Sequence, residues 1–453
     1  MRLSRGMSSL VLLLAVSTSV SVAAELGALS GAGINPAVIG MNQPPQDITV
    51  ERIARLPVVQ RAAWVAYLHH SEEQRKVDKA KLAAERTPGV PIPEMPKENP
   101  GARSMPLHQE AAWYGSPEAR HIADVILSFQ TPAGGWSKNL DMSGAPRAKG
   151  QSYTPDNLSK HLSEADFDAP KEPQWNYVGT LDNDATVTEL RFLALVAGQA
   201  GDAAARYRES FLRGVRYLLN AQFPNGGWPQ VWPLEGGYHD AITYNDNAVT
   251  QTADLMTTVA AGEGDYAFVP ANLRAEADKS ARHALQCILD TQLKVKGKRA
   301  GWAQQQDALT FEPESGRNYE PASLASSESA DVLLYLMALP NPSKAVVTAV
   351  EGGIQWLTSA EIQGQEWTSK TAPGGRTLVA KPGAGPLWAR YYDLATDRPV
   401  FGDRDKTLHD DVNDLSRERR NGYSWFNESP AKALTAYKTW SAKSIPATEV
   451  LKK

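Results

Sequence analysis

Apolar residues recur along this chain with the spacing of amphipathic helices. Two segments show the pattern most clearly, with apolar side chains at i, i+3, i+4 and i+7 or at i, i+4, i+7 and i+8: Ile122, Val125, Ile126 and Phe129, and Phe211, Val215, Leu218 and Leu219. This spacing places the apolar side chains of each segment on one helix face. The alternation typical of strands is almost absent. The pattern therefore predicts an all-α protein.

A weak internal repeat accompanies the predicted helices. In each copy an amphipathic helix ends in glutamine, and a loop with glycine and tryptophan follows. Three copies are clear and a looser fourth runs from Ile354 to Trp367; the clear copies have Gln130 with Trp136, Gln222 with Trp228, and Gln292 with Trp302. Repeats of about 65 to 90 residues predict paired helices stacked around an axis, as in an α/α toroid whose loops line a cleft. Each tryptophan is expected to plug a gap between helix pairs, with sugar stacking as the alternative.

Four regions divide the chain. Residues 1–24 have the positive start, short apolar core and small-residue cleavage site of a secretory signal peptide. Residues 25–106 form an irregular and partly helical N-terminal region that ends in a proline-rich linker. Residues 107–440 form the main helical domain, and residues 441–453 form a polar tail. The signal peptide predicts a secreted or periplasmic protein.

Composition excludes several classes of partner. Hydrophobic residues make up 42% and charged residues 22% of the 453 residues, and the formal net charge is −4. A mildly acidic chain without a long Lys/Arg cluster argues against binding to nucleic acid or to an anionic membrane. The single cysteine, Cys287, excludes an internal disulfide and is expected to be a buried, inert thiol. We expect a monomer that a large core holds together.

Two patches of acidic and amide residues stand immediately before predicted helices, at positions 180–186 and 243–250. They read Thr-Leu-Asp-Asn-Asp-Ala-Thr and Thr-Tyr-Asn-Asp-Asn-Ala-Val-Thr. Carboxylate and amide oxygens are the ligands that hard cations such as calcium prefer. The same residue types also cap helix N-termini, and a single patch would be interpreted in that way. Because the pattern occurs twice, we favour two loops that converge on one cation.

Arginines flanked by aromatic residues form a second kind of cluster, at positions 317–321, 386–393 and 398–405. A guanidinium can stack on an aromatic ring while it binds a carboxylate with two hydrogen bonds. The alternative is a structural ion pair with Asp393, Asp403 or Asp405. Acidic patches together with arginine patches suit a polyanion such as a uronic-acid polysaccharide. The chain has no glycine-rich loop of the type that cradles phosphate.

The longer motifs together resemble those of the family 10 polysaccharide lyases, which are pectate lyases with an α/α toroid fold. The resemblance covers roughly residues 107 to 440 in chain order. The motifs that carry it are at 134–139, 180–183, 225–230, 244–247, 301–305, 317–321, 390–393 and 404–405. It does not extend to the first 100 residues.

This resemblance implies a secreted pectate lyase that cleaves polygalacturonate by calcium-dependent anti-β-elimination and releases unsaturated oligogalacturonides. By correspondence of motifs, Asp182, Asn183 and Asp246 fall at the calcium site, and Arg404 falls at the base that removes the C5 proton. Further side chains are expected to contact the substrate: Arg317, Arg390, Tyr319 and Lys138. For Lys138 we also consider a role in capping a helix end.

Several details of this assignment depend on the environment of each side chain. A guanidinium has a pKa of at least about 12, so a base of this kind requires an environment that lowers the pKa, and we expect optimal activity above about pH 8. Asp184 is expected either to support the calcium site from outside the ligand set or to have a structural role. His239 and Asp240 could hydrogen-bond a sugar, although a purely structural role in their loop is favoured.

Two other functions fit part of the pattern. A glycoside hydrolase on the same architecture would use two carboxylates, such as Asp182 and Asp246, on either side of the glycosidic bond. It would release no unsaturated product. A non-catalytic, calcium-dependent binder of acidic glycans would keep the cleft but lack a competent base, so it would tolerate the loss of Arg404.

Overall fold

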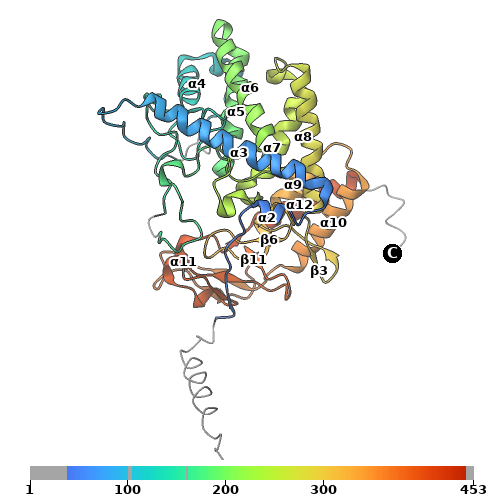
Figure 1. The fold of residues 1–453 in the computed structure, drawn as a ribbon. Coiled ribbons are helices and arrows are strands. Elements are labelled where there is room, and N and C mark those ends of the chain that lie inside the picture. The colour runs from blue at the N-terminus through green and yellow to red at the C-terminus, as the bar shows by residue number, and fades with distance from the viewer. Residues whose placement is uncertain (1–37, 100–104, 160–161, 445–453) are drawn as a thin grey trace, which may run out of the picture.

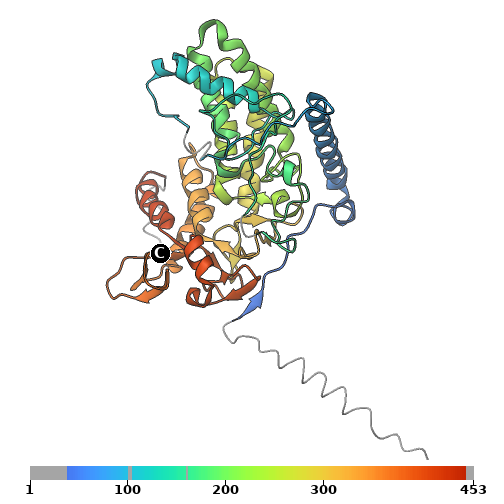
Figure 2. The ribbon, with the colours of Figure 1, turned by 90° about the vertical axis from the view of Figure 1, so that its left-hand side faces the viewer.

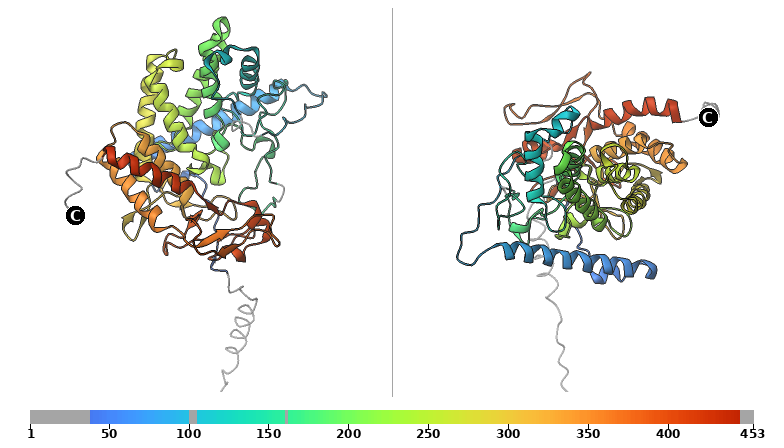
Figure 3. Two further views of the ribbon diagram at one scale, coloured as in Figure 1. Left: turned by 180° about the vertical axis from the view of Figure 1, so that it is seen from behind. Right: turned by 90° about the horizontal axis from the view of Figure 1, so that it is seen from above.

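The computed structural model describes residues 38–99, 105–159 and 162–444, so the predicted signal peptide lies outside the described residues. The fold is mainly helical, as predicted, and helices surround a common axis in an incomplete α/α toroid (Figures 1 and 3). The helices of this body are α4 (Pro117–Phe129), α5 (Val187–Gln199), α6 (Ala204–Ala221), α7 (Ala248–Ala261), α8 (Ala271–Asp290), α9 (Ser326–Ala338), α10 (Lys344–Ser359) and α12 (Ser429–Ser444).

The helices pack in pairs that follow the chain order. Helix α5 packs on α6, α7 packs on α8, and α9 lies between α10 and α12. Helices α5, α7 and α9 also contact one another in sequence. The apolar faces predicted for α4 and α6 are buried: Ile126, Phe211 and Val215 have no exposed surface. This packing brings the loops before α5, α7 and α9 to the same end of the toroid.

The repeated glutamines tie each helix pair to the next. The Nε2 atom of Gln130 donates to the carbonyl oxygens of Gly134 (2.8 Å) and Ser210 (2.9 Å). The same pair of hydrogen bonds recurs at the next two repeats. Gln222 donates to the carbonyl oxygens of Gly226 and Ser280, and Gln292 donates to those of Ala300 and Ala349. In each case one acceptor lies in the following loop and the other in a neighbouring helix. The repeat therefore encodes a contact between helices.

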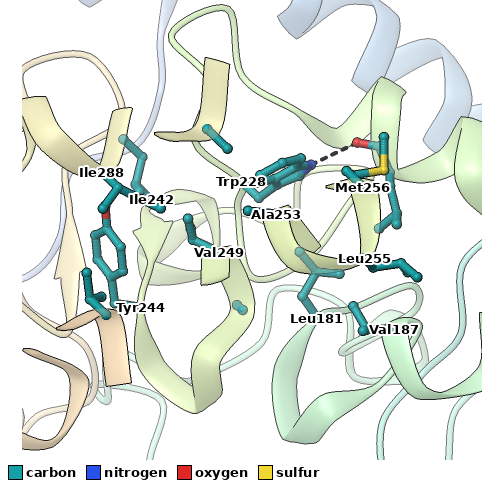
Figure 4. Packing of buried hydrophobic residues seen from close by; sticks show 14 of the residues in the cluster. Leu181, Val187, Trp228, Ile242, Tyr244, Val249, Ala253, Leu255, Met256 and Ile288 are labelled. Atoms are coloured by element: carbon teal, nitrogen blue, oxygen red, sulfur yellow. Dashed lines mark hydrogen bonds between the residues drawn. The ribbon is translucent and has the colours of Figure 1, made fainter. Parts of the chain in front are cut away.

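The repeated tryptophans are structural, as favoured from the sequence. Trp136, Trp228 and Trp302 are fully buried, and each indole Nε1 donates to a carbonyl oxygen near the end of the preceding helix. Figure 4 shows Trp228 beside Ala253 and Met256 of α7. Because no face of these rings reaches solvent, they are not available for sugar stacking.

The fourth copy differs from the prediction. Trp388, and not Trp367, occupies the equivalent position, because the Trp388 Nε1 donates to the carbonyl oxygen of Leu357 (2.7 Å) and the ring is 1% exposed. Trp367 lies in a hairpin strand and is half-buried. The longer loop of this copy displaces the plugging residue along the chain, which the sequence spacing could not indicate.

Short strands join the loops of the toroid. Within the described residues there are fourteen, each of two or three residues, and all pairs are antiparallel. The sheets are β1 (Gly40–Met41) with β13 (Thr407–His409) and β12 (Phe401–Gly402); β2 (Ile242–Thr243) with β5 (Gln305–Gln306) and β6 (Pro313–Glu314); β7 (Leu324–Ala325) with β11 (Tyr391–Tyr392); β10 (Trp388–Ala389) with β14 (Phe426–Asn427); β3 (Lys294–Val295) with β4 (Lys298–Arg299); and β8 (Gln365–Trp367) with β9 (Leu378–Ala380). Strands this short leave no periodic signal in a sequence.

The N-terminal region is part of the folded body. It contains α2 (Val50–Ile53) and α3 (Val58–Glu85), and α3 runs along the outside of the toroid (Figure 2). Trp64 and Tyr67 pack on Phe223, and the Tyr67 hydroxyl donates to the carbonyl oxygen of Ala221 (2.9 Å). Helical composition here was predicted, but the docking was not.

One further prediction concerns the only cysteine of the sequence. Cys287 is buried and unpaired, as expected. Among the described residues, none of the helices combines the length and apolar character needed to cross a bilayer. Helix α12 ends at Ser444, and residues 445–453 of the predicted tail lie outside the described residues.

Candidate active site

Two 3₁₀ turns, η4 (Asp182–Asp184) and η7 (Asn245–Asn247), contact each other at the starts of α5 and α7. Their backbone is left-handed at Asn183 (φ 53°), Asp184 (φ 64°), Asp246 (φ 48°) and Asn247 (φ 62°). Asn and Asp tolerate this conformation better than other residues with a side chain. Strained backbone of this kind often accompanies functional sites. The two sequence patches thus adopt the same unusual local structure.

The two patches converge, as predicted. The buried Asp182 carboxylate accepts from Gln230 Nε2 (2.9 Å) and interacts directly with Asp246. The Asn245 amide spans both carboxylates, at 3.4 Å from Asp182 Oδ1 and 3.0 Å from Asp246 Oδ2. The capping alternative is not supported, because neither N-cap residue, Thr186 of α5 or Asn247 of α7, caps its helix with a side-chain hydrogen bond.

Lys138 supplies positive charge to this acidic pair. Its Nζ lies 2.6 Å from Asp182 Oδ2 and 3.4 Å from the centre of the Tyr177 ring. Burial raises the pKa of the Asp182 carboxyl, but the charge and the hydrogen bond of Lys138 lower it by more, to about 2. Asp182 is therefore ionised at all physiological pH values. Lys138 lies at the acidic pair and does not cap a helix.

A pocket of about 420 Å³ opens beside Lys138 and carries five cationic side chains: Lys138, Arg317, Arg390, Arg404 and Arg419. Tyrosine rings make up much of the remaining wall, at Tyr177, Tyr238, Tyr319 and Tyr423. All the substrate contacts predicted from the sequence, together with the predicted base, therefore line one pocket. The concentration of cations makes the pocket suited to a polyanion.

Arg317 projects from the loop between β6 and β7. Its Nη2 lies 2.7 Å from Glu320 Oε1, and the Glu320 carboxylate also accepts from the backbone N–H of Arg317 (2.8 Å). Burial raises the pKa of Glu320, but Arg317 lowers it by more, to about 2. In return Glu320 raises the pKa of Arg317, against the effect of burial, to well above its usual value. Arg317 thus stays charged.

Arg390, the residue between β10 and β11, is held in a similar way. Its Nη2 lies 2.5 Å from Glu328 Oε1 on α9 and 3.0 Å from Asn245 Oδ1. The charge of Glu328 raises the pKa of Arg390, against the effect of burial. Through Asn245 this arginine is connected to the acidic pair.

Arg404 also lines the pocket, from the turn between β12 and β13. Its Nε and Nη2 bind the two oxygens of Glu418 at 2.8 and 3.1 Å. Hydrogen bonds from Arg419 and Arg404 lower the pKa of Glu418 to about 2. The ring of Tyr319 lies among these cations, 5.6 Å from Arg404 and 4.3 Å from Arg419, which is the predicted stacking of arginine on an aromatic ring.

The alternative of structural ion pairs is correct in that the arginines are paired, but it named the wrong carboxylates. The pocket arginines do have carboxylate partners, but these are the glutamates Glu320, Glu328 and Glu418. The aspartates named from the sequence bind loop groups instead: Asp393 accepts from Thr396, Asp403 from Ser416, and Asp405 from Thr407. Arg419 and Glu418 were missed from the sequence, because nothing near them distinguishes a site residue from a surface helix.

The other predicted residues bind groups of neighbouring loops and helices. Asn183 donates through Nδ2 to Asn139 Oδ1 (3.0 Å), and Asp184 accepts from Gln251 (2.6 Å). His239 is buried against Tyr238, and burial lowers its pKa to about 3, so the ring is neutral. Asp240 accepts two backbone N–H bonds within its own loop. The structural interpretation of His239 and Asp240 is therefore the better one.

The acidic pair has the donor chemistry of a calcium site. Two adjacent carboxylates offer hard oxygen ligands, and calcium takes six to eight ligands of this kind. Within the described ranges, histidine, cysteine, aspartate and glutamate nowhere gather in the groups of three or more that could hold a metal. These carboxylates would therefore supply only part of such a site.

Known proteins resemble this chain in both sequence and structure. The family model for pectic acid lyase matches residues 130–434. The structure of a family 10 polysaccharide lyase from Cellvibrio cellulosa is 30% identical to this chain in sequence and superposes with a TM-score of 0.61. The structure of a mutant family 10 polysaccharide lyase from the same organism, in complex with trigalacturonic acid, is 29% identical with a TM-score of 0.61. Each alignment covers 73% of this chain and 95% of the other. No curated protein matches the chain in sequence.

Proposed function

Because the chain belongs to the pectic acid lyases of polysaccharide lyase family 10, we propose that it cleaves polygalacturonate by calcium-dependent anti-β-elimination outside the cytoplasm. The observation that carries the proposal is a pocket that gathers five cationic side chains, one of which, Lys138, also binds the Asp182 carboxylate. The similar lyase in complex with trigalacturonic acid supports an oligogalacturonate as the ligand.

Arg317 and Arg390 are the residues that hold substrate carboxylates in this proposal. Glutamate partners raise the pKa of both guanidinium groups, so both stay charged at alkaline pH. The same partners fix the direction of each guanidinium before substrate binds, which reduces the entropy lost on binding. Lys138 supplies a further charge at the acidic pair.

Asp182, Asp246 and the amide oxygen of Asn183 would hold the calcium ion. When bound, the ion would withdraw electron density from the substrate carboxylate and make the adjacent C5 proton more acidic. Asp182 suits this role because its carboxylate is ionised down to a pKa of about 2.

Arg404 is the proposed base. In the elimination the C5–H and C4–O4 bonds break, a C4–C5 double bond forms, the base takes the C5 proton, and the departing O4 takes a proton from water. Arg404 lies in the pocket wall, and its Nε and Nη2 are bound to Glu418, which leaves Nη1 for the substrate. A guanidinium base is favoured at high pH, so we expect optimal activity above about pH 8. A sharp optimum near about pH 5 would argue against it.

The proposed function is tested by an assay for the unsaturated product of elimination. The purified protein is incubated with polygalacturonate at alkaline pH, with calcium or with a chelator, while ultraviolet absorbance and new reducing ends are followed together. A calcium-dependent rise of both signals is the expected result, since the unsaturated product has a double bond conjugated to a carboxylate. New reducing ends without absorbance would show hydrolysis instead.

The hydrolase alternative is less consistent with the site. Glycosidases hold their two carboxyl groups about 5 to 9.5 Å apart so that the sugar lies between them. Asp182 and Asp246 interact directly, and the amide of Asn245 joins them. A binding protein without catalysis remains the other outcome of the test, with neither signal and retained affinity for trigalacturonic acid.

A further inference from the structure

An arm at the N-terminus of the described chain reaches the active-site end of the toroid. Strand β1 pairs with β13, with Gly40 opposite Leu408 and Met41 opposite Thr407. The next residue continues the contact, since the Asn42 backbone N–H donates to the carbonyl oxygen of Lys406 (2.7 Å). The arm precedes residue 130, where the match to the family model begins. It is therefore a contribution from outside the matched segment.

The side chain of Asn42 binds the backbone of the loop that carries Arg317. Its Nδ2 lies 3.3 Å from the carbonyl oxygen of Arg317, 3.0 Å from that of Asn318 and 3.3 Å from that of Glu320. Its Oδ1 accepts from Ser315 Oγ (2.7 Å). Asn42 is 6% exposed, so water cannot easily replace these bonds.

The same loop is bound to the turn that carries Arg404. Asn318 Nδ2 donates to the carbonyl oxygen of Arg404 (2.7 Å), and Asn318 Oδ1 accepts from the backbone N–H of Phe167 (2.9 Å). Asn42 thus contacts both of these segments. Its side chain binds residues 315–320 of the loop that carries Arg317, and its backbone binds Lys406 in the turn that carries Arg404.

We propose that Asn42 is a positioning residue, which fixes the loop of Arg317 and Glu320 relative to the turn of Arg404. The proposal rests on the function proposed above, because that function assigns the arginines. Asn42 does not line the pocket. It acts by holding the backbone of the loop from which the Arg317 side chain projects. A displacement of about 1 Å of such a group can cost about 100-fold in rate.

The test compares Asn42→Ala with Gln43→Ala in the full chain. Gln43 is the adjacent exposed residue, and its side chain bonds only within the arm, to the carbonyl oxygen of Met41. We expect Asn42→Ala to lower kcat/KM by about 10- to 100-fold at temperatures far below unfolding, while Gln43→Ala retains the wild-type value. A residue that only stabilises the fold would lower the unfolding temperature and leave kcat/KM unchanged.

A second readout does not depend on activity. The backbone N–H of Gly316 donates to the carbonyl oxygen of Glu320, and that of Glu320 to the carbonyl oxygen of Arg317, so amide hydrogen exchange at these two positions reports on the loop. We expect faster exchange there in Asn42→Ala, with unchanged exchange at Phe223 and Gly226, whose N–H groups bond within their own loop. If the wild type eliminates nothing, the proposed function fails, and the exchange result still decides the role of Asn42.

Ser315→Ala provides a milder change if Asn42→Ala does not fold. It removes only the hydrogen bond to Asn42 Oδ1, and the same effects are expected at smaller size. Wild-type exchange at residues 316 and 320 together with wild-type kcat/KM, in whichever variant folds, would overturn the proposal.

Discussion

At the scale of single residues, the site consists of paired charges. Lys138, Arg317, Arg390 and Arg404 each bind a carboxylate of the protein. Such pairs hold each cation in one geometry, and a buried charge without a partner would be unfavourable. A substrate carboxylate would then add to groups that are already oriented, which favours selective binding of a regularly charged polymer.

Asp182→Ala tests the acidic pair. We expect activity at sub-saturating calcium to fall at least about tenfold, and the calcium concentration for half-maximal activity to rise, because one carboxylate ligand is lost. The measurement is a calcium titration of the initial rate. Asp202→Asn, at an exposed position on a distant turn, serves as the control. A variant with the wild-type calcium dependence would refute the ligand assignment.

Arg404→Lys and Arg317→Lys test the division of roles among the arginines. Loss of the base at Arg404 should lower kcat by about 100-fold or more, since positioned bases contribute about that much. Loss of a carboxylate contact at Arg317 should mainly raise KM. Arg216→Lys, on the exposed surface of α6, is the matched control. If the kcat effect belongs to Arg317 and the KM effect to Arg404, the two roles are exchanged.

The sequence could predict the members of the site better than their partners. The patches that contain Asp182 and Asp246 were identifiable because they are local and duplicated, and the family resemblance selected these two residues within them. The pairing of Arg404 with Glu418, fourteen positions away, and of Lys138 with Asp182, forty-four positions away, depends on tertiary packing. No spacing rule in the sequence contains that information.

At the scale of elements, the repeat explains how the toroid holds together. A glutamine at each helix end binds two carbonyl groups, one in its own loop and one in a neighbouring helix. Amphipathic spacing predicted the helices around these residues, because a helix face of period 3.6 is a local property. The two-residue strands could not be predicted, because their pairing is set by distant segments.

Gln292→Ala tests the structural role of the repeat. The change leaves the carbonyl groups of Ala300 and Ala349 without their shared donor in a buried position. We expect the free energy of unfolding to fall by about 1 to 3 kcal/mol, measured by denaturant unfolding. Gln199→Ala, at the exposed end of α5, should change it little. Equal effects of the two substitutions would contradict this role.

At the scale of the whole molecule, buried carboxylic acids make stability depend on pH, and Glu189 has the highest pKa among those in the described residues. Glu189 lies in the first turn of α5 with 1% of its surface exposed, and burial raises its pKa from 4.5 to about 8. The folded state then keeps a proton that the unfolded state loses. Its contribution to stability is full below about pH 4.5 and is lost as the pH rises through about 8.

Glu189→Gln should remove this dependence. We expect the variant to gain stability relative to the wild type as the pH rises from about 5 to about 9, by an amount on the order of a few kcal/mol. Thermal unfolding across that range measures it. A difference between variant and wild type that stays constant with pH would show that Glu189 ionises normally.

The N-terminal region makes the catalytic end depend on residues far away in sequence. Helix α3 packs along the outside of the toroid, and the arm before it contacts the loops of Arg317 and Arg404. Its helical composition was visible in the sequence. Its docking was not, because Trp64 and Tyr67 find their partners on a helix-end segment more than 150 positions later.

The most direct test of the central claim is the mass of the cleavage products from polygalacturonate, with calcium and with a chelator. Elimination adds no water, so we predict calcium-dependent oligogalacturonides whose new non-reducing ends are lighter by one water molecule than those of a hydrolase. Fully hydrated fragments, or fragments that form equally well with the chelator, would contradict the account.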